Sequence, residues 1–401
     1  MTGDRFFLIP IALGHLALFV LVVNVIHGFG HPERVMERAK LVLVAVFIAI
    51  SGVIAWEASQ GAIEGWSWPS LVYSGVCGVT GLVVFPAMTA YLLNRPVPVG
   101  IREQQRVIDL TESIGADALT GTGKYARLLR LPGNESFRLR TAEWQVPLAC
   151  LPRALDGLSI LHLSDLHLAP CFDLRYFEAV FEQAATVPSD LVLFTGDLVD
   201  SDEAMEWVAP LFSRLKGRLG ACAILGNHDL SHDPARLSRL LGEAGFLDLE
   251  GRWTTVEAEG ARIALGGTSF PWGPALPLEE RPTADVSILL SHAPDLFYWA
   301  ERARFDLMLS GHNHGGQIRL PLIGPVFMPS RYSRRFDRGF FRRGALTLHV
   351  SQGVAGKHPV RYGCVPEIGR LVLRAVDPDG ATSLSGSRRR ASGRPLRNPR
   401  R

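Results

Sequence analysis

Five short segments of the chain carry the residue types that bind metal ions. They are SDLHL (164–168), TGDLVD (195–200), LGNHD (225–229), LLSHAP (289–294) and SGHNHGG (310–316). Carboxylate oxygen, amide oxygen and neutral imidazole suit Mn, Fe, Zn, Co or Ni better than calcium. The candidate ligands are Asp165, His167, Asp197, Asn227, His292, His312 and His314. This set exceeds one ion and suits two ions that share a carboxylate, an arrangement used for in-line displacement at phosphorus.

Two of these segments place their candidate ligands one residue apart, as Asp165 with His167 and His312 with His314. In an extended chain, side chains at i and i+2 point the same way, so each pair is expected to face one cluster. A polar turn after a strand explains any single motif. Five such motifs, each at the end of an apolar run, favour a metal site.

The elements that must position these residues are short apolar runs, each followed by one of the motifs or lying between them. The runs lie at 158–163, 190–195, 221–225, 261–267, 286–290 and 306–310. Each fits a buried strand, and the patterns at 174–186 and 233–245 fit helices. Asp233 and Pro234 indicate a helix start, and Gly245 indicates its end. The alternation predicts an α/β fold, in which ligands gather beyond the carboxyl ends of the strands.

The first hundred residues have a different character. Uncharged apolar stretches cover about residues 6–26, 41–56 and 69–93. The first and third reach the roughly 20 residues that a membrane-spanning helix needs, and the second is slightly short. We therefore predict three transmembrane helices within a membrane region over 1–94. Among Asp, Glu, Lys, Arg and His, they contain only His15, which argues against a transporter.

Charges in the loops predict the orientation. The loop after the first stretch holds Arg34, Arg38 and Lys40, whereas the loop at 57–68 holds no lysine or arginine. The positive-inside rule then places the first loop, and everything after residue 94, in the cytoplasm. We expect a bacterial plasma (inner) membrane protein with several spans and a catalytic domain that faces the cytoplasm.

The rest of the chain divides by composition. Residues 95–134 mix proline, glycine and charge, which predicts a linker with one short helix at most. A globular domain follows over 135–376. The segment 377–401 should be a disordered tail, and its last seventeen residues hold seven arginines and no acid, so the rest of the chain carries a net charge of +3 − 7 = −4. The tail either binds anionic lipid or is merely solvated, and the acidic body argues against nucleic acid as a partner. The five cysteines form no C-x-x-C motif and are expected to be buried free thiols.

The order D-x-H, GD-x-x-D, GNHD, a lone His and G-H-x-H resembles the calcineurin-like metallophosphoesterases over residues 135–376. The segments LPRALDGLSILHLSDLHL (151–168) and GVAGKHPVRYGCVPEI (353–368) look most like the bacterial membrane-associated phosphoesterases of the YkuE and YaeI type. The resemblance implies a four-layer α/β/β/α sandwich with two divalent metal ions.

The resemblance also implies a role for each residue. The first metal would take Asp165, His167, Asp197 and His314. The second would take Asp197, Asn227, His292 and His312. The bridging ligand would be Asp197. The residue that protonates the leaving oxygen would be His228, oriented by Asp200, while Asp229 has no direct contact and Asn313 is a spacer.

The expected function is a membrane-anchored phosphoesterase that cleaves a phosphodiester or pyrophosphate bond by attack of a metal-bridged hydroxide. Three membrane helices favour a phosphorylated substrate in a lipid or envelope precursor. A surface loop at 269–282 and a basic, partly apolar rim at 317–336 are candidates for substrate contact, although an ordinary connection and a solvated hairpin explain them equally well. Two alternatives stay open, namely action on soluble nucleotides and a membrane-anchored scaffold with weak or lost catalysis.

Overall fold

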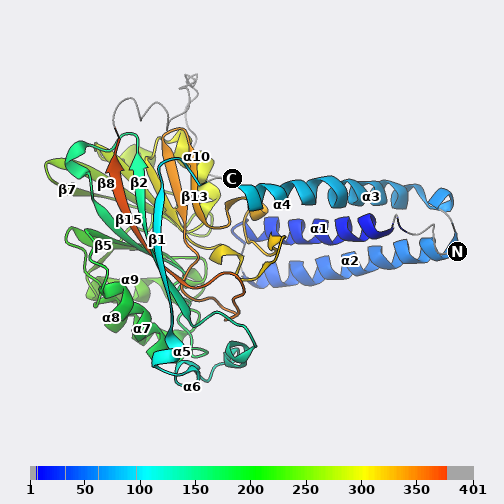
Figure 1. Ribbon diagram of the computed structural model, residues 1–401, viewed down its shortest axis with the longest axis horizontal. Helices are drawn as coiled ribbons and strands as arrows, with labels where there is room; N and C mark the ends of the chain where they lie inside the picture. Colours follow the sequence, from blue (N-terminus) through cyan, green and yellow to red (C-terminus); the bar gives the residue numbers. More distant parts are fainter. Residues whose placement is uncertain (1–5, 7, 32, 62, 96, 377–401) are drawn as a thin grey trace. The chain divides into compact units, whose positions relative to one another are not determined.

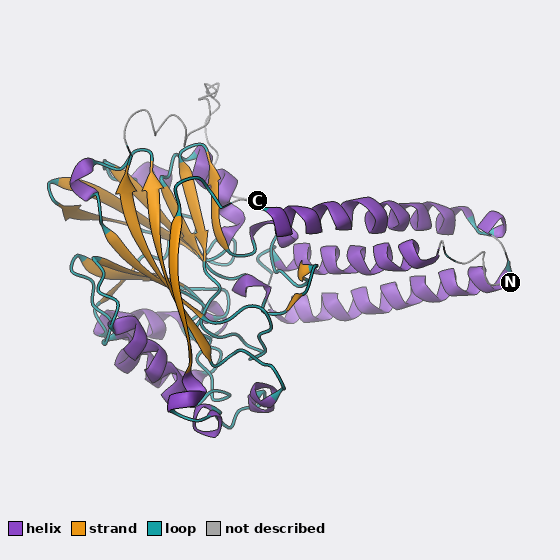
Figure 2. Cartoon of the chain, viewed as in Figure 1, coloured by secondary structure: helices purple, strands orange, loops and turns teal. Residues whose placement is uncertain are grey.

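The computed structural model describes residues 6, 8–31, 33–61, 63–95 and 97–376 (Figures 1 and 2). The basic tail predicted over 377–401 lies outside the described residues. The chain forms two units, which are described separately below. One comprises Met1–Pro96 with Leu320–Arg335, here called the membrane unit, and the other comprises Val97–Arg319 with Phe336–Arg401, here called the phosphoesterase unit.

The membrane unit contains three long apolar helical segments. They are α1 (Leu8–His27), α2 (Glu33–Gln60) and a segment in which α3 (Trp68–Val79), a π-helical turn (Thr80–Val84) and α4 (Phe85–Asn94) run on without a break. All three are long and apolar enough to cross a membrane, as predicted. The second helix is longer than the predicted stretch 41–56, because a charged N-terminal part starting at Glu33 precedes its apolar part.

Close contact between α1 and α3 depends on two glycines. A Cβ atom at Gly14 would lie 1.7 Å from the carbonyl oxygen of Cys77, and one at Gly81 would lie 2.5 Å from that of Pro10. Small residues at helix crossings allow such an approach in membrane proteins. The ring of His15 hydrogen-bonds the Tyr73 hydroxyl at 2.6 Å and the Ser51 hydroxyl at 2.8 Å. The His15 side chain therefore links three helices.

The phosphoesterase unit is built on two sheets. The first sheet has the order β1 (Arg102–Asp109), β2 (Arg138–Leu148), β15 (Glu367–Ala375), β3 (Ser159–Leu163), β4 (Leu191–Thr195), β5 (Gly220–Ile224) and β6 (Phe246–Asp248). The second has the order β13 (Gly339–Arg343), β14 (Leu346–Val350), β10 (Leu307–Ser310), β9 (Val286–Ser291), β8 (Ala261–Thr268) and β7 (Trp253–Ala258). The longer helices are α7 (Leu174–Ala185), α8 (Val208–Phe212), α9 (Pro234–Glu243) and α10 (Phe297–Arg302), and two single turns are α5 (Leu110–Ser113) and α6 (Ala116–Leu119).

Alternation along β3 shows how the layers are packed. Leu161 and Leu163 belong to a core that they share with Phe177 of α7, whereas Ile160 belongs to a second core with Ile288 of β9. One face of the first sheet thus packs on helices and the other on the second sheet (Figure 1). Helix α10 packs against β14 of the second sheet. The predicted four-layer α/β/β/α sandwich is confirmed.

The sequence prediction is wrong for part of the segment 95–134. Residues 102–109 are not a linker but form β1, which pairs antiparallel with β2 from Arg102 opposite Gln145 to Asp109 opposite Arg138. Its sequence REQQRVID has no apolar alternation, and its first six residues are exposed at the sheet edge. Backbone pairing rather than burial forms this strand, so periodicity gives no signal for it.

A buried histidine pair bridges the two sheets. His162 of β3 and His349 of β14 are both fully buried, and their Nδ1 atoms lie 2.9 Å apart. The Nε2 atom of His162 bonds the Thr195 hydroxyl, and Glu367 lies 3.8 Å from Nε2 of His349. Burial lowers the pKa of His162, with a further contribution from His349. Burial, helped by the charge of Arg140, also lowers the pKa of His349, to about 3.

This pair predicts acid sensitivity. Below pH 6.5 the unfolded chain binds protons on these rings before the folded chain does, so stability falls as the pH drops towards the folded pKa. Each histidine contributes about 1.4 kcal/mol per pH unit. In His349→Gln we expect a slope of unfolding free energy against pH that is lower by about this amount between pH 6 and 4. Urea unfolding of the detergent-purified protein measures it. His358→Gln, at an exposed histidine, is the control, and equal slopes in both variants would contradict the prediction.

Candidate metal centre

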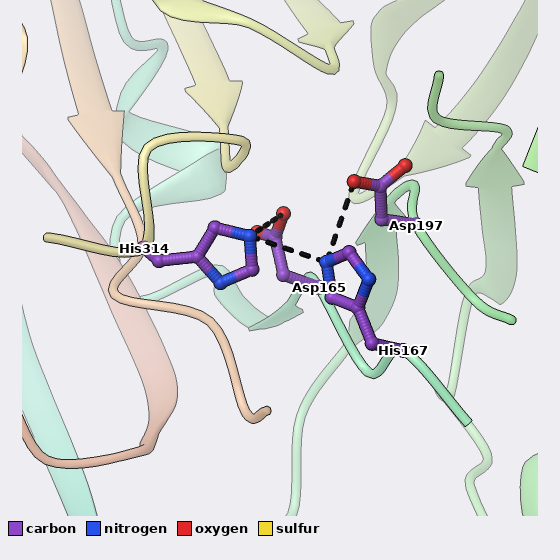
Figure 3. A group of neighbouring side chains, drawn as sticks. All are labelled: Asp165, His167, Asp197 and His314. Carbon is purple, nitrogen blue, oxygen red and sulfur yellow. Dashed lines mark hydrogen bonds and ion pairs between the residues drawn. The ribbon is translucent and has the colours of Figure 1, made fainter. Parts of the chain in front are cut away.

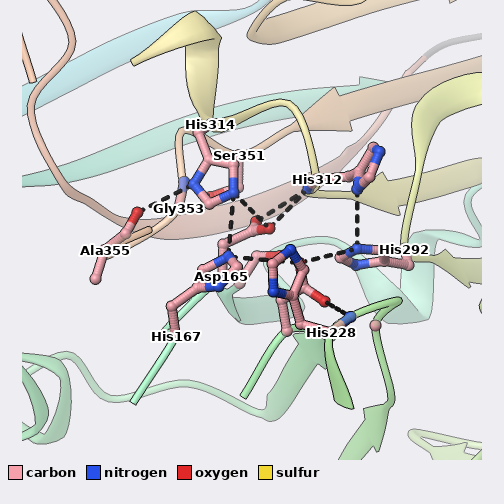
Figure 4. Close-up of polar contacts among 12 residues, drawn as sticks. Asp165, His167, His228, His292, His312, His314, Ser351, Gly353 and Ala355 are labelled. Atoms are coloured by element: carbon pink, nitrogen blue, oxygen red, sulfur yellow. Dashed lines mark hydrogen bonds and ion pairs between the residues drawn. The ribbon is translucent and has the colours of Figure 1, made fainter. Parts of the chain in front are cut away.

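The ends of five strands bring the predicted ligands together. Three of these strands, β3, β4 and β5, are parallel neighbours in the first sheet, and β9 and β10 are parallel neighbours in the second. The turns that follow them carry Asp165 and His167, Asp197, Asn227, His292, and the pair His312 and His314. All seven side chains point into one region between the sheet edges, as Figure 4 shows for most of them. The sequence therefore predicts the location of the site.

The first cluster consists of Asp165, His167, Asp197 and His314 (Figure 3). One ligand atom from each lies within 4.8 Å of the others. The Nε2 atom of His167 lies 3.1 Å from Nε2 of His314 and 3.4 Å from Oδ2 of Asp197. The Nε2 atom of His314 lies 3.5 Å from Oδ1 of Asp165. Two nitrogens and two carboxylates facing one point match the donor set of a transition-metal ion.

The second cluster consists of Asp197, His292 and His312, again with ligand atoms within 4.8 Å of one another. The Asn227 amide oxygen joins it, 3.0 Å from Nε2 of His292. The Nδ1 atom of His312 lies 3.1 Å from that same nitrogen. Oδ2 of Asp197 lies 3.4 Å from Nε2 of His292 and also 3.4 Å from Nε2 of His167. One carboxylate oxygen is thus shared between the two clusters.

The outer nitrogen of three of these rings is held by an acceptor. The Nδ1 atom of His292 bonds the carbonyl oxygen of Thr195 at 2.8 Å, and that of His314 bonds the carbonyl oxygen of Ala355 at 3.0 Å. The Nδ1 atom of His167 bonds the Asp200 carboxylate at 3.0 Å. An acceptor at Nδ1 places the proton there and leaves a lone pair on Nε2, as is usual for metal-ligating histidines. The residues present therefore fit metal ions.

The backbone of the site differs from the expected extended geometry. Asp165, His167, Asp197, His312 and His314 all have a positive φ, between 46° and 67°. The one-residue spacing therefore reflects tight turns after β3 and β10 rather than strand alternation. Left-handed backbone is uncommon for residues with a side chain, and it concentrates at functional sites. The strain is the physical mark of a site whose side chains must turn back over the sheet edge.

Two glycines make room for the carboxylates. A Cβ atom at Gly226 would lie 2.0 Å from Oδ1 of Asp197, and one at Gly311 would lie 2.1 Å from Oδ2 of Asp165. Neither position can carry a side chain without displacing a candidate ligand. The glycines in GNHD and GHNH are therefore required because they have no side chain that would occupy the place of a carboxylate.

A histidine and an aspartate stand beside the first cluster. The Nδ1 atom of His228 lies 2.5 Å from Oδ1 of Asp200, and its backbone N–H donates to Oδ1 of Asp197 at 3.0 Å. Burial lowers the pKa of His228, but Asp197 and Asp200 outweigh it and raise the value to about 10. Burial raises the pKa of Asp200, but His167 and His228 outweigh it and hold the value well below its ordinary range. This geometry suits a proton-donating imidazolium held by a carboxylate.

Two residues without an assigned role hold the turns in place. The buried Asp229 carboxylate accepts hydrogen bonds from the backbone N–H groups of Leu198, Val199 and Gly226, and so joins the turns after β4 and β5. Asn313 is more than the expected spacer, because its buried side chain donates to the carbonyl oxygen of Phe336 at 2.6 Å. Polar character in a motif is the only signal for either role in the sequence.

The two segments considered for substrate contact have different places. The loop 269–282 does reach the site, since the half-buried ring of Trp272 lies 4.8 Å from that of His312 and 5.9 Å from that of His292, between centroids. Most of the basic segment 317–336 does not belong to the phosphoesterase unit, because Leu320–Arg335 forms part of the membrane unit. Its interpretation as a rim of the active site stays a prediction.

Comparison with known proteins agrees with this geometry. The family described as calcineurin-like phosphoesterase matches residues 158–316. The chain is 30% identical over 279 residues to an uncharacterized metallophosphoesterase, YkuE of Bacillus subtilis, covering 66% of this chain and 95% of that protein. It is 30% identical over 223 residues to the phosphodiesterase YaeI of Escherichia coli, covering 53% and 81%. It is also 30% identical to a bovine (Bos taurus) transmembrane protein with metallophosphoesterase domain, covering 58% and 56%.

Proposed function

This chain belongs to the calcineurin-like metallophosphoesterase family and is a metal-dependent phosphoester hydrolase, and from that premise we propose that it uses two divalent ions to cleave a phosphodiester or pyrophosphate bond. The shared position of Asp197 carries the proposal. Its Oδ2 atom is equidistant, at 3.4 Å, from a histidine of each cluster. A single carboxylate so placed can neutralise two cations at once, and the nitrogen and oxygen donors suit Mn, Fe, Zn, Co or Ni.

Each cluster would hold one ion. Asp165, His167 and His314 would complete the first site, and Asn227, His292 and His312 the second, with Asp197 in both. When bound, the two cations supply a nucleophile at neutral pH and neutralise charge on the phosphoryl oxygens. The protein contributes the fixed geometry, because five of the seven ligands are buried and the outer nitrogens of three rings are held by Thr195, Ala355 and Asp200.

The proton for the leaving group would come from His228. Its ring is fixed at Nδ1 by Asp200, which leaves Nε2 to donate a proton to the departing oxygen. Its backbone N–H donates to Asp197 and its ring lies 4.7 Å from that of His167, between centroids, so the ring stands beside the metal clusters. Proton transfer by a positioned side chain contributes about 10²–10⁴ to the rate of such reactions.

The substrate would be a phosphorylated amphiphile at a membrane. The site is tied closely to the membrane unit by the chain itself, because the unit boundary at Leu320 lies six residues after His314. Six residues reach at most about 20 Å when fully extended. The second boundary between the units lies at Arg335–Phe336, and the Phe336 carbonyl accepts a hydrogen bond from Asn313 of the GHNH motif. A site joined by so short a segment to three helices that can span a membrane is expected to meet lipid-linked phosphates more often than soluble ones. By loop charge, we place it on the cytoplasmic side of a bacterial inner membrane.

Metal removal tests the proposed reaction. We expect the detergent-purified protein, stripped with a chelator, to lose hydrolysis of bis-p-nitrophenyl phosphate, and Mn²⁺ titration to restore it as two equivalents bind. Binding is read independently of activity by elemental analysis of the desalted protein. Saturation at one equivalent would contradict the paired site, and binding without hydrolysis would favour a scaffold.

The substrate class is tested with the reconstituted protein. We expect lipid-linked diphosphates and phosphodiesters in vesicles to be cleaved with a higher kcat/KM than soluble nucleotides carrying the same bond. Efficient cleavage of the nucleotides with none of the lipids would overturn the amphiphile and leave the metal chemistry intact.

A further inference from the structure

One segment of the membrane unit comes from the catalytic half of the sequence. Residues 320–335 belong with the apolar helices, although Asn24 of α1 and Val326 lie 302 positions apart along the chain. The segment includes a small hairpin of β11 (Arg319–Leu320) and β12 (Gly324–Pro325), and β12 packs against α4. The chain therefore leaves the phosphoesterase unit just after the metal-binding motif, joins the membrane helices and returns.

A buried asparagine holds this segment to α1. The Asn24 side chain is completely buried in an otherwise apolar helix. Its Oδ1 atom accepts from the Met328 N–H at 2.9 Å, and its Nδ2 atom donates to the Val326 carbonyl and the Ser333 hydroxyl, both at 3.2 Å. A buried amide with no partner is costly in an apolar environment, so the bound segment satisfies what the helix alone would not.

The end of the helix bundle fits the segment closely. A Cβ atom at Gly28 would lie 2.3 Å from the backbone nitrogen of Arg331, so only glycine allows this approach. The Arg331 guanidinium lies 4.7 Å from the ring centroid of Phe29, and that of Arg334 lies 5.2 Å from the ring centroid of Phe85. This is the bundle end where α1 ends, where α4 ends, and where α2 begins with Arg34, Arg38 and Lys40 in its sequence.

The rest of the segment exposes apolar side chains. Leu322 at the hairpin tip is 81% exposed, Phe327 is 46% exposed and Leu320 is 44% exposed. Single exposed apolar residues are ordinary on a protein surface. Here three of them share one short segment that is fixed to helices long enough to span a bilayer, with the exposed Arg331 and Arg335 after them in sequence. An apolar tip with basic neighbours is the composition of elements that lie in the headgroup region.

We infer that residues 320–327 form a lipid-inserted finger, whose leucine and phenylalanine side chains enter the leaflet at the basic end of the bundle. Arg331 and Arg335 would face the lipid phosphates. The occupant of this apolar surface is the bilayer that already surrounds the three helices, because the finger is continuous with them. Since the finger begins six residues after His314, its insertion would keep this end of the metal-binding motif within about 20 Å of the headgroup layer. The inference rests on the membrane helices and goes beyond the proposed reaction.

Site-directed fluorescence tests the insertion in the full chain. Leu322→Cys is placed in a Cys150→Ala background, where the remaining native cysteines are buried, and is labelled with the environment-sensitive dye NBD. The protein is reconstituted in phosphatidylcholine–phosphatidylglycerol vesicles with acyl-chain spin-labelled lipid. The matched control is Leu247→Cys, at a leucine of β6 that is 48% exposed in the phosphoesterase unit. We expect strong quenching at 322 and none at 247. A water-like, unquenched dye at 322, or equal quenching at both sites, would overturn the finger.

Further variants separate this inference from the proposed function. Leu322→Glu with Phe327→Glu should leave hydrolysis of bis-p-nitrophenyl phosphate unchanged and lower kcat/KM on vesicle-borne substrates, whereas unchanged kcat/KM there contradicts the finger. If the unaltered protein cleaves no lipid, the amphiphilic substrate fails while quenching at residue 322 still decides the insertion. Asn24→Leu should speed tryptic cleavage at Arg331 and Arg335, and an unchanged rate would contradict the anchoring role of Asn24.

Discussion

Replacing Asp197 by asparagine is expected to abolish hydrolysis, with kcat at least about a thousandfold lower, since the several kcal/mol contributed by metal-ion catalysis depend on both ions. The substitution keeps the shape of the side chain and removes the negative charge that both clusters share. Bound Mn²⁺ should fall from two equivalents to one or none, measured by elemental analysis of the desalted protein. Steady-state hydrolysis of bis-p-nitrophenyl phosphate measures the loss.

Asp202→Asn is the matched control for this variant. Asp202 lies in the same region of the chain, is 77% exposed and pairs only with His232 among the ion pairs described. It should retain both metal equivalents and full activity. An Asp197→Asn protein with two bound ions and unchanged kcat would show that Asp197 does not bridge the clusters.

Replacing His228 by glutamine should have an effect that depends on the leaving group. Glutamine keeps hydrogen-bonding capacity but cannot deliver a proton. For an alkyl phosphodiester, whose alkoxide needs that proton, we expect kcat to fall by about 10²–10⁴. For a p-nitrophenyl ester, whose anion leaves unprotonated, the loss should be far smaller. The two losses, measured on the same preparation, report proton donation separately from positioning.

His232→Gln serves as its control, because His232 also forms a histidine–aspartate pair, with Asp202 at 2.7 Å, but lies outside the metal clusters. It should leave both substrates unaffected. Equal losses for the two leaving groups in His228→Gln would exclude His228 as the acid and leave it a positioning residue.

The fold could be predicted from the sequence where a strand is buried on both faces of its sheet, because such a strand is a continuous apolar run. The central strands around Ile160, Val192 and Ile288 are such runs, and the neighbouring helices α7 and α9 are amphipathic. The edge strand β1 could not be predicted, because its sequence is polar and its backbone pairing with β2 leaves no pattern in the side chains. The segment 320–335 gave no local signal either. Its position depends on Asn24, some 300 residues earlier, and on close contact at Gly28.

The site was readable in its residue types but not in its geometry. Acid, amide and imidazole groups after successive strands mark the candidate ligands, because the strand ends of an α/β sheet meet at one edge. The left-handed backbone at His312 and His314 was not evident, since spacing alone fits a strand equally well. Nor could sequence show that the carbonyl oxygens of Thr195 and Ala355 hold the rings, because every residue has a carbonyl group.

The route of the chain through both units bears on how a soluble form of the enzyme can be made. Truncation at Val97 would remove the helices yet keep residues 320–335, stripped of Asn24 and of every apolar surface they pack against. A truncated protein that starts at residue 135 would also lack β1, and the edge of β2 would lose its backbone hydrogen-bond partners. The residues that flank the segment 320–335 already contact each other, because Arg319 and Asp337 form an ion pair at 3.0 Å. A short glycine-rich turn from Arg319 to Phe336 would therefore remove residues 320–335 and keep the Phe336 carbonyl that accepts from Asn313 in the metal-binding turn, giving a protein suited to crystallisation in aqueous buffer.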